Sequence, residues 1–283
     1  MLQNGAVLPA DVLIFDLEDS VVASEKDAAR ELVASALRSI DYGGRRLTVR
    51  INDLEKPYVK KDLKAVVAAG AHSIMVPKVT GAHTIHHIAV MLDLIEEEYG
   101  FKKGRTRIIA LIETALGIEK AFEAATSSSR VEALALGGED LCADLGCPRT
   151  KEGMELLYSR SRLLIAARAA GVDAIDTPFT DARDENGCYA DTVYARSLGF
   201  DGKLSISPHH LRSIHRAFTP TEDAVAFALE VIESMKRAKC DGRGAVSLRG
   251  KMIDLPVLRQ AERTLELARA SGMIVTETGE KPS

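Results

Sequence analysis

The chain of 283 residues contains 46% hydrophobic and 28% charged residues, a composition that excludes a disordered, collagen-like or disulfide-stapled protein. Its formal net charge of −4 excludes a general electrostatic attraction to nucleic acid or to an anionic membrane. The four cysteines include no CxxC pair, and no apolar run is long enough to span a bilayer. We therefore expect a soluble cytoplasmic protein with free thiols and with no nucleic-acid or membrane partner.

Seven short runs rich in Val, Ile and Leu recur along the chain, and each is apolar enough for a strand buried on both faces of a parallel sheet. The runs are Val12–Leu17, Leu47–Ile51, Ser73–Pro77, Ile108–Ile112, Val131–Leu136, Asp173–Asp176 and Lys203–Ser207. Segments with helical spacing separate them, and the first of these begins at a capping box, Ser24-Glu25-Lys26-Asp27. This alternation predicts an α/β domain, either a (β/α)8 barrel or an open doubly wound sheet.

Polar residues follow the carboxyl ends of six of these runs, which favours the barrel, because a barrel carries its chemistry at the ends of many strands. These residues are Asp16 to Asp19, Arg50 to Asp53, Lys78, Glu113, Gly138 to Asp140 and Asp176. A dinucleotide-binding sheet would instead show one glycine-rich turn, and the sequence contains neither a GxGxxG motif nor a P-loop. The seven runs are one fewer than a closed barrel needs.

A helical extension is expected after the last strand. A second capping box, Thr219-Pro220-Thr221-Glu222, predicts a long helix, and Leu255–Ala270 has the spacing of another amphipathic helix. Between them, residues 240–252 contain three glycines and predict a flexible loop. We therefore expect a barrel domain over residues 1–218 and a C-terminal helical extension over residues 219–283.

Glu113 and Asp140 are expected on neighbouring strands at the same rim of the barrel. Two carboxylate ligands leave the other coordination positions of a metal ion free for water and substrate, which suits Mg²⁺. A structural ion pair, or a helix cap made by Asp140, would account for the same two residues. The backbone amides at Gly138 and Glu139 lie beside them and offer a place for a substrate carboxylate.

Arg50 ends an otherwise apolar strand, so its guanidinium should reach the rim. There it can hold a substrate carboxylate or an enolate oxygen. A salt bridge to Asp16, Glu18 or Asp19 is an equal alternative. These three acids either orient metal-bound water or balance the charges of Arg50 and Lys78.

Seven motifs occur together in one order along the chain. They are Asp16-Leu17-Glu18-Asp19-Ser20-Val21, Val49-Arg50-Ile51-Asn52, Val76-Pro77-Lys78-Val79, Leu111-Ile112-Glu113-Thr114, Gly138-Glu139-Asp140-Leu141, Ala174-Ile175-Asp176 and Gly250-Lys251-Met252-Ile253-Asp254. By these motifs the chain resembles the HpcH/HpaI aldolase and citrate lyase β-subunit family, especially its citrate lyase β-like and malyl- or citramalyl-CoA lyase members. The resemblance extends from Ala10 to about Ala270.

The resemblance implies a (β/α)8 TIM-type barrel and an Mg²⁺-dependent carbon–carbon lyase. Its substrate would be a 3-hydroxyacyl-CoA such as citramalyl-, malyl- or citryl-CoA, and its products a CoA thioester and an α-keto acid. Glu113 and Asp140 would be the metal ligands, and Arg50 would bind the thioester oxygen or the substrate carboxylate. Asp254 would be the general acid/base, reaching a neighbouring subunit's active site in a homo-oligomer, commonly a trimer.

Two departures from the family pattern leave other functions open. Family members usually begin with a strand of the type Arg-Ser-x-Leu-Phe-Val-Pro-Gly before the first run seen here, so we expect a barrel that lacks its first β-strand. Ser207 stands where the family commonly has the histidine of Ile-His-Pro. The alternatives are a non-catalytic or weakly active partner subunit of a lyase complex, and an aldolase that acts on hydroxy acids without CoA.

Overall fold

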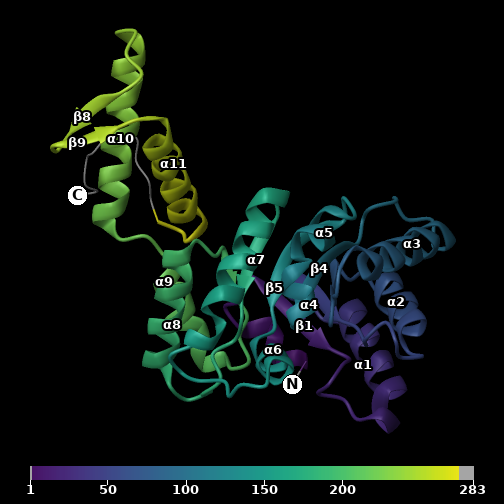
Figure 1. Ribbon diagram of the computed structural model, residues 1–283. Helices are drawn as coiled ribbons and strands as arrows, with labels where there is room; N and C mark the ends of the chain where they lie inside the picture. The colour runs from purple at the N-terminus through teal and green to yellow at the C-terminus, as the bar shows by residue number, and fades with distance from the viewer. Residues whose placement is uncertain (1, 274–283) are drawn as a thin grey trace. The chain divides into compact units, whose positions relative to one another are not determined.

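The computed structural model describes residues 2–273 and divides them into two units, residues 2–211 and residues 212–273 (Figure 1). The first unit contains a parallel sheet with helices, and the second contains two long helices and a hairpin. In the described part of the chain, no helix combines the length and the apolarity needed to cross a membrane.

Seven strands of the first unit pair in parallel, in the order of the sequence. They are β1 (Val12–Asp16), β2 (Arg46–Arg50), β3 (Ser73–Val76), β4 (Arg107–Ile112), β5 (Val131–Leu136), β6 (Asp173–Asp176) and β7 (Gly202–Lys203). Each coincides with an expected apolar run or overlaps it, so the predicted strand positions are confirmed. β7 is shorter than expected, because the Ser205 hydroxyl donates to the Ser207 carbonyl oxygen at 2.9 Å and bends the chain there.

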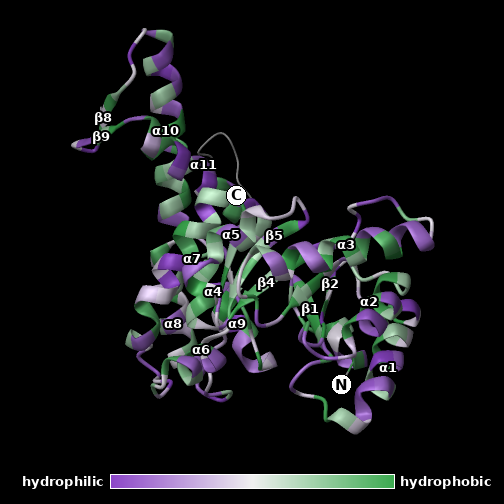
Figure 2. Cartoon of the chain, turned by 45° about the vertical axis from the view of Figure 1, so that its right-hand side comes forward, coloured by the Kyte–Doolittle hydropathy of each residue, from purple (hydrophilic) through white to green (hydrophobic). Residues whose placement is uncertain are grey.

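Helices cover one face of this sheet and follow one another around it (Figure 1). They are α1 (Lys26–Ser39), α2 (Val59–Ala68), α3 (Ala82–Glu98), α4 (Ala115–Glu119), α5 (Ala121–Thr126), α6 (Gly138–Leu145), α7 (Leu157–Ala170) and α8 (Glu185–Leu198). Strand side chains on the helix-facing side, such as Ile74, Ile108 and Leu134, are fully buried in one large core. Figure 2 shows the corresponding pattern, with apolar colouring along the strands.

The other face of the sheet lies inside a curve. A second apolar cluster on this face consists of Met75, Ile109, Leu111, Ala133 and Ala135. Arg46 of β2 forms an ion pair with Glu132 of β5, although these strands are three positions apart in the sheet. Because neighbouring strands lie about 4.8 Å apart, these two side chains meet only if the sheet is curled. The fold is therefore α/β, with a curled parallel sheet in the strand order of a (β/α) barrel.

The curled sheet has two edges. Among the described strands, β1 pairs only with β2 and β7 pairs only with β6. Val12 and Ile14, which alternate with the core-facing residues of β1, are 38% and 39% exposed. In the part of the chain that the structure covers, β1 and β7 are therefore the two edge strands of this sheet.

The first helix begins differently from the capping-box prediction. Ala23–Glu25 form a short 3-10 turn, and α1 starts at Lys26 without a side-chain cap. The Lys26 ammonium donates to the carbonyl oxygens of Leu17 and Glu18, both at 2.7 Å. The prediction was wrong because this stretch stabilises the loop after β1 instead of capping the helix.

The second unit contains α10 (Glu222–Cys240), β8 (Val246–Leu248), β9 (Lys251–Ile253) and α11 (Leu255–Ala270), and α9 (Leu211–Phe218) leads into it. α11 has the bounds that its apolar spacing predicted. The cap of α10 is Thr221, whose side-chain oxygen accepts from the Ala224 amide at 3.2 Å. Pro220 therefore precedes the cap, whereas the capping box had placed it inside the helix.

A small core holds the second unit together. Val231, Ile253 and Leu265 are buried in it, and they come from α10, β9 and α11. Residues 240–252, expected as a flexible loop, include the antiparallel pair of β8 and β9. The buried side chain of Ile253 packs the hairpin against this core. The three glycines had suggested a flexible loop and gave no sign of this contact.

Candidate active site

Polar side chains gather where the parallel strands end, because the carboxyl ends of such strands meet at one edge of the sheet. Asp16 and Arg50 are the last residues of β1 and β2, and Glu113 directly follows β4. Lys78 follows β3 by two residues, and Asp140 lies in the first turn of α6, after β5. Five successive strands thus bring the residues expected at the rim to the same edge.

Arg50 is held by Asp16 through two hydrogen bonds. Arg50 Nε donates to Asp16 Oδ1 at 2.8 Å, and Nη2 donates to Oδ2 at 2.6 Å. Burial by itself raises the pKa of Asp16, but the hydrogen bonds and charge of Arg50 outweigh this effect and bring the pKa down to about 2. Burial lowers the pKa of Arg50, and the nearby carboxylates more than compensate, so this pKa lies above its usual value. The salt bridge expected as one alternative is therefore present.

Glu18 lies between two cations and is only 3% exposed. Its Oε2 lies 3.3 Å from Arg50 Nη1, and its Oε1 lies 3.1 Å from Lys78 Nζ. Glu18 is thus a buried anion shared by two cations. Lys78 Nζ also lies 3.6 Å from Asp19. Burial lowers the pKa of Lys78, but Glu18 and Asp19 raise it above its usual value.

The main chain at Lys78 orients Glu113. Lys78 has φ 51°, in the left-handed region that few residues other than glycine adopt. In this conformation its amide donates to Glu113 Oε1 at 2.7 Å. Strained backbone of this kind persists where the surrounding structure requires it, and such residues cluster at functional sites.

Glu113 is a buried carboxylate with negative neighbours. Its exposure is 3%, and burial, together with the charges of Asp140 and Glu18, raises its pKa to about 8. Gly137 packs so closely against it that a Cβ at this position would lie 2.5 Å from Glu113 Oε2. The carboxylate is thus confined by the main chain on two sides.

These residues fit a divalent cation. No group of three or more His, Cys, Asp or Glu side chains able to hold a metal occurs within residues 2–273. Mg²⁺, however, is commonly held by one or two carboxylates with water and substrate in its other positions. The raised pKa of Glu113 shows that its charged form lacks a positive partner strong enough to offset burial and Asp140. Hard oxygen donors with excess negative charge are the donor set that Mg²⁺ prefers.

The turn at the start of α6 was expected to bind a carboxylate through its amides. The Gly138 amide instead donates to Thr177 Oγ1 at 2.9 Å, so it already has a partner within the protein. A Cβ on Gly138 would lie 2.7 Å from that oxygen, which explains why the turn needs glycine. Glu139 is exposed and lies 3.7 Å from Arg149 Nε. Thr177, which the motifs did not single out, therefore holds the helix that carries Asp140.

Two further expected residues, Asp254 and Ser207, form local hydrogen bonds. Asp254 belongs to the second unit, where it caps α11 and its Oδ1 accepts from the Val257 amide at 3.4 Å. Ser207 is buried and donates its hydroxyl proton to the Ala182 carbonyl oxygen at 3.0 Å. Both side chains thus have local partners of their own.

A buried ion network at the end of β6 escaped sequence reasoning. Arg160 donates to both oxygens of Asp176, at 2.8 and 2.9 Å, and to Asp191 at 2.8 Å. Lys203 donates to the same two aspartates, both at 2.6 Å. The four charges balance, and the side chains of Arg160, Asp176 and Lys203 are fully buried. Asp176 therefore has a structural role at this rim. The four residues of the network come from four separate elements, α7, β6, α8 and β7.

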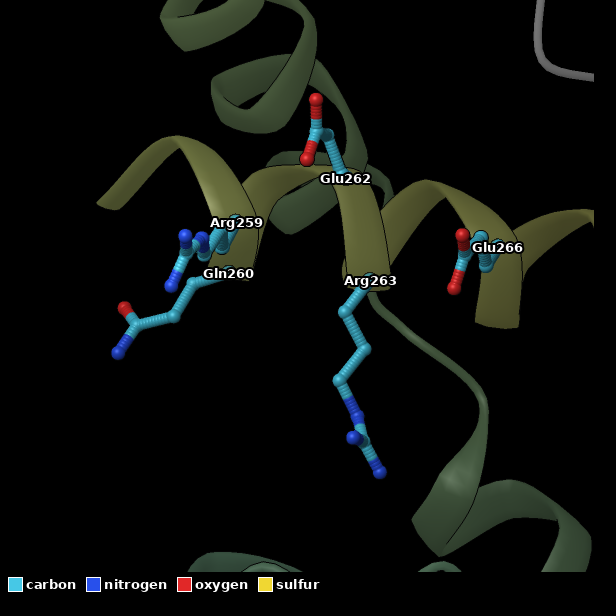
Figure 3. A pocket seen from close by; sticks show the side chains of 5 residues that line it. All are labelled: Arg259, Gln260, Glu262, Arg263 and Glu266. Atoms are coloured by element: carbon cyan, nitrogen blue, oxygen red, sulfur yellow. The ribbon is translucent and has the colours of Figure 1, made fainter. Parts of the chain in front are cut away.

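A hollow on the surface of the second unit is lined by α11 alone (Figure 3). Its lining residues are Arg259, Gln260, Glu262, Arg263 and Glu266. Figure 3 shows Arg259, Gln260 and Arg263 extending from one side of the helix and Glu262 pointing away from them. Side chains from one helix that diverge in this way do not converge on a ligand.

The chain is similar to known proteins of one family. The profile of the family described as HpcH/HpaI aldolase/citrate lyase matches residues 1–208. Citrate lyase subunit beta of Leuconostoc mesenteroides subsp. cremoris is 42% identical over 277 residues, covering 98% of this chain and 92% of that protein. L-malyl-CoA/beta-methylmalyl-CoA lyase of Rhodobacter capsulatus is 33% identical over 292 residues, covering 95% and 92%.

A solved structure extends the comparison to three dimensions. Protein CitE from Mycobacterium tuberculosis, in complex with magnesium, acetoacetate and coenzyme A, has a TM-score of 0.75 and 32% sequence identity. The match covers 92% of this chain and 90% of that one. The chain therefore belongs to the HpcH/HpaI aldolase/citrate lyase family and is a carbon–carbon lyase.

Proposed function

We propose that this lyase cleaves a 3-hydroxyacyl-CoA, and forms it in reverse, with a CoA thioester and an α-keto acid as products. Citramalyl-, malyl- and citryl-CoA are the substrates we expect. The observation that carries the proposal is the buried carboxylate of Glu113, held by the Lys78 amide beside the charge of Asp140. The relatives named as citrate lyase and malyl-CoA lyase support the substrate class.

We assign Mg²⁺ to Glu113 and Asp140. When bound there, the ion supplies Lewis acidity to the oxygens of the keto-acid fragment. The chain's part is to keep the two carboxylates in place: the Lys78 amide and Gly137 confine Glu113, and Thr177 holds the start of α6. The magnesium in the similar CitE structure supports the choice of metal.

Arg50 is assigned to the thioester oxygen, on which negative charge develops as the carbon–carbon bond breaks. Asp16 holds two of its N–H groups, so the guanidinium is oriented before substrate binds. Its raised pKa keeps it positively charged throughout. A preorganised donor of this kind contributes roughly 100- to 1000-fold to rate. Asp16 and Glu18 support Arg50 as its counter-charges, and Lys78 shares Glu18 with Arg50 and is also paired with Asp19.

The substrate carboxylate is assigned to the turn at Gly138 and Glu139. Because the Gly138 amide already donates to Thr177 Oγ1, the Glu139 amide is the donor we assign to it. Proton transfer is assigned to Asp254, which directly follows β9 at the start of α11. In this proposal Asp254 acts on the site of a neighbouring subunit, and the enzyme is a homotrimer.

The proposed architecture is a TIM-type barrel in which one strand position is open. The seven strands occupy consecutive positions, and the half-exposed Val12 and Ile14 lie at the open edge. We propose that the barrel domain spans residues 1–218 and the helical extension residues 219–283. The division of the structure after residue 211 lies close to this boundary.

A second candidate is a partner subunit of a multi-protein lyase, with little activity of its own. The 42% identical relative is named as a subunit, citrate lyase subunit beta, which favours this alternative. It differs from the first proposal in needing other chains for turnover.

The test is a panel of citramalyl-, malyl- and citryl-CoA and of the corresponding free hydroxy acids, incubated with and without Mg²⁺, with α-keto acid release as the readout. Glu113→Gln and Asp140→Asn should each lower turnover by at least about 100-fold. Glu97→Gln, a change at an exposed acid outside the rim, is the matched control. Calorimetric titration with Mg²⁺ alone measures metal binding without turnover.

The outcomes separate the candidates. Metal binding that both variants lose, together with cleavage of one CoA ester, supports the proposed enzyme. Metal binding without cleavage supports the partner subunit, and cleavage of the free hydroxy acids alone supports the CoA-independent aldolase. Normal Mg²⁺-dependent activity in Glu113→Gln would show the metal assignment to be wrong.

A further inference from the structure

Two cysteines meet at the C-terminal end of α6, and the proposed reaction uses neither of them. Cys142 lies in the last turns of the helix and is 2% exposed. Cys147 lies just beyond the helix and is half-buried. Both pack against the large core of the first unit.

The helix ends in a Schellman motif, which fixes the spacing of the two residues. Gly146 adopts the left-handed conformation with φ 71°, and its amide donates to the Ala143 carbonyl oxygen at 3.2 Å. The Cys147 amide donates to the Cys142 carbonyl oxygen at 3.0 Å. In this motif the residues at these two positions commonly have side chains in contact.

Both side chains pack against the same apolar core, so they lie on the same side of the turn. A disulfide requires Cα atoms within about 7 Å of each other. The backbone hydrogen bond from the Cys147 amide to the Cys142 carbonyl oxygen holds these two residues close together. The αL conformation of Gly146 keeps this turn tight, because glycine has no Cβ to oppose it.

We propose that Cys142 and Cys147 form a reversible intramolecular disulfide, which makes this turn a redox modification site. The Cys147 thiolate, on the accessible side, attacks a small-molecule disulfide such as oxidised glutathione, breaks its S–S bond and expels one glutathione thiolate. The Cys142 thiolate then attacks the Cys147 sulfur of the mixed disulfide and expels the second glutathione. Two protein thiols are oxidised, one small disulfide is reduced, and the two protons pass to the released thiols.

The inference goes beyond the proposed function and does not depend on it. The new bond would join the last turns of α6 to the residue that ends its Schellman motif. α6 carries Asp140 in its first turn, so the modification would stiffen the element that holds one proposed metal ligand.

The test uses the folded full chain in buffers of reduced and oxidised glutathione, followed by alkylation, trypsin digestion and mass spectrometry. Both cysteines lie in one tryptic peptide, residues 131–149, because no Lys or Arg occurs between Arg130 and Arg149. We expect this peptide to lose two hydrogen atoms and to resist alkylation. Cys188, which is fully buried, and Cys240, which is exposed, are internal references on other peptides.

Variants separate the bond from general oxidation. In Cys142→Ser the proposal predicts that Cys147 accumulates as the glutathione adduct, because no second thiol can displace it. Cys240→Ser should leave oxidation of the 131–149 peptide unchanged. Reaction of Cys240 shows that the oxidant is active. If Cys240 reacts in the wild-type chain while Cys142 and Cys147 both stay reduced, or while Cys147 stops at the glutathione adduct, the proposal is overturned. Formation of the bond only after unfolding in urea would overturn it as well, and none of these readouts depends on lyase activity.

Discussion

Adding a single methyl group at Gly137 should disturb the candidate site through contact alone. In Gly137→Ala, the new Cβ would lie 2.5 Å from Glu113 Oε2 and 2.6 Å from Glu113 Cβ. Real Cβ atoms essentially never approach another atom within 3.0 Å, and Glu113 Cβ is too close to the main chain to swing aside. Gly137 has φ −98°, which alanine adopts freely, so no backbone strain is added. The ends of β4 and β5 must therefore move apart.

Overpacking of this kind costs about 1 to 3 kcal/mol. For a domain of this size, that corresponds to a melting temperature lower by about 2 to 12 °C. Mg²⁺ affinity should fall together with stability, because the displaced side chain is a proposed ligand. Calorimetric titration with Mg²⁺ and thermal melting measure the two effects.

Gly202→Ala provides the matched control for this prediction. Gly202 also lies in the sheet, in β7, but a Cβ there would meet only the flexible end of Ile175, at 3.3 Å. We expect its melting temperature and Mg²⁺ affinity to stay close to those of the parent chain. If Gly137→Ala melted like Gly202→Ala and bound Mg²⁺ as the parent does, the close packing of Glu113 would not matter for the site.

Lys203→Met should destabilise the fold by about 3 to 5 kcal/mol, because it leaves two buried aspartates with Arg160 as their remaining cation in the network. Urea unfolding measures this cost, and an equal loss in the exposed variant Lys236→Met would contradict it. Glu155 should make stability depend on acid pH. Burial raises its pKa, but hydrogen bonds from Thr150 and Arg149 lower it from 4.5 to about 2. The stabilising effect of Glu155 is therefore complete above pH 4.5 and is lost as pH falls towards 2. Glu155→Gln should therefore be less stable than the parent at pH 7, and the difference in unfolding free energy should shrink between pH 4.5 and 2; a difference independent of pH would show that the lowered pKa is not its source.

Part of the site could be predicted because it follows the strands. Arg50 is the last residue of one apolar strand, and Glu113 directly follows another. Because the carboxyl ends of parallel strands meet at one edge of the sheet, the two residues could be expected at the same site. The conformation of Lys78 could not be predicted in this way. Its positive φ depends on the packing of the loop after β3, and a lysine in the sequence gives no sign of it.

Helix starts were predicted less well than strands. The pattern Ser24 to Asp27 matches a capping box, but in the structure the Lys26 ammonium binds the carbonyl oxygens of Leu17 and Glu18. Local patterns of this kind fail when a tertiary partner binds one of their residues more strongly. The charge network around Asp176 escaped detection for a related reason, since Arg160 lies 16 residues away in sequence and its other partners lie on different elements.

Apolar periodicity and the ordered motifs established, without coordinates, the α/β alternation and the family, since both depend on residues close together in sequence. The pairing of charges was decided by folding. Whether Arg50 reaches Asp16, or the Glu113 carboxylate receives the Lys78 amide, depends on distances of a few ångströms between segments far apart in the chain. The strength of these interactions depends on the burial around them, and burial arises only when the sheet and its helices pack together.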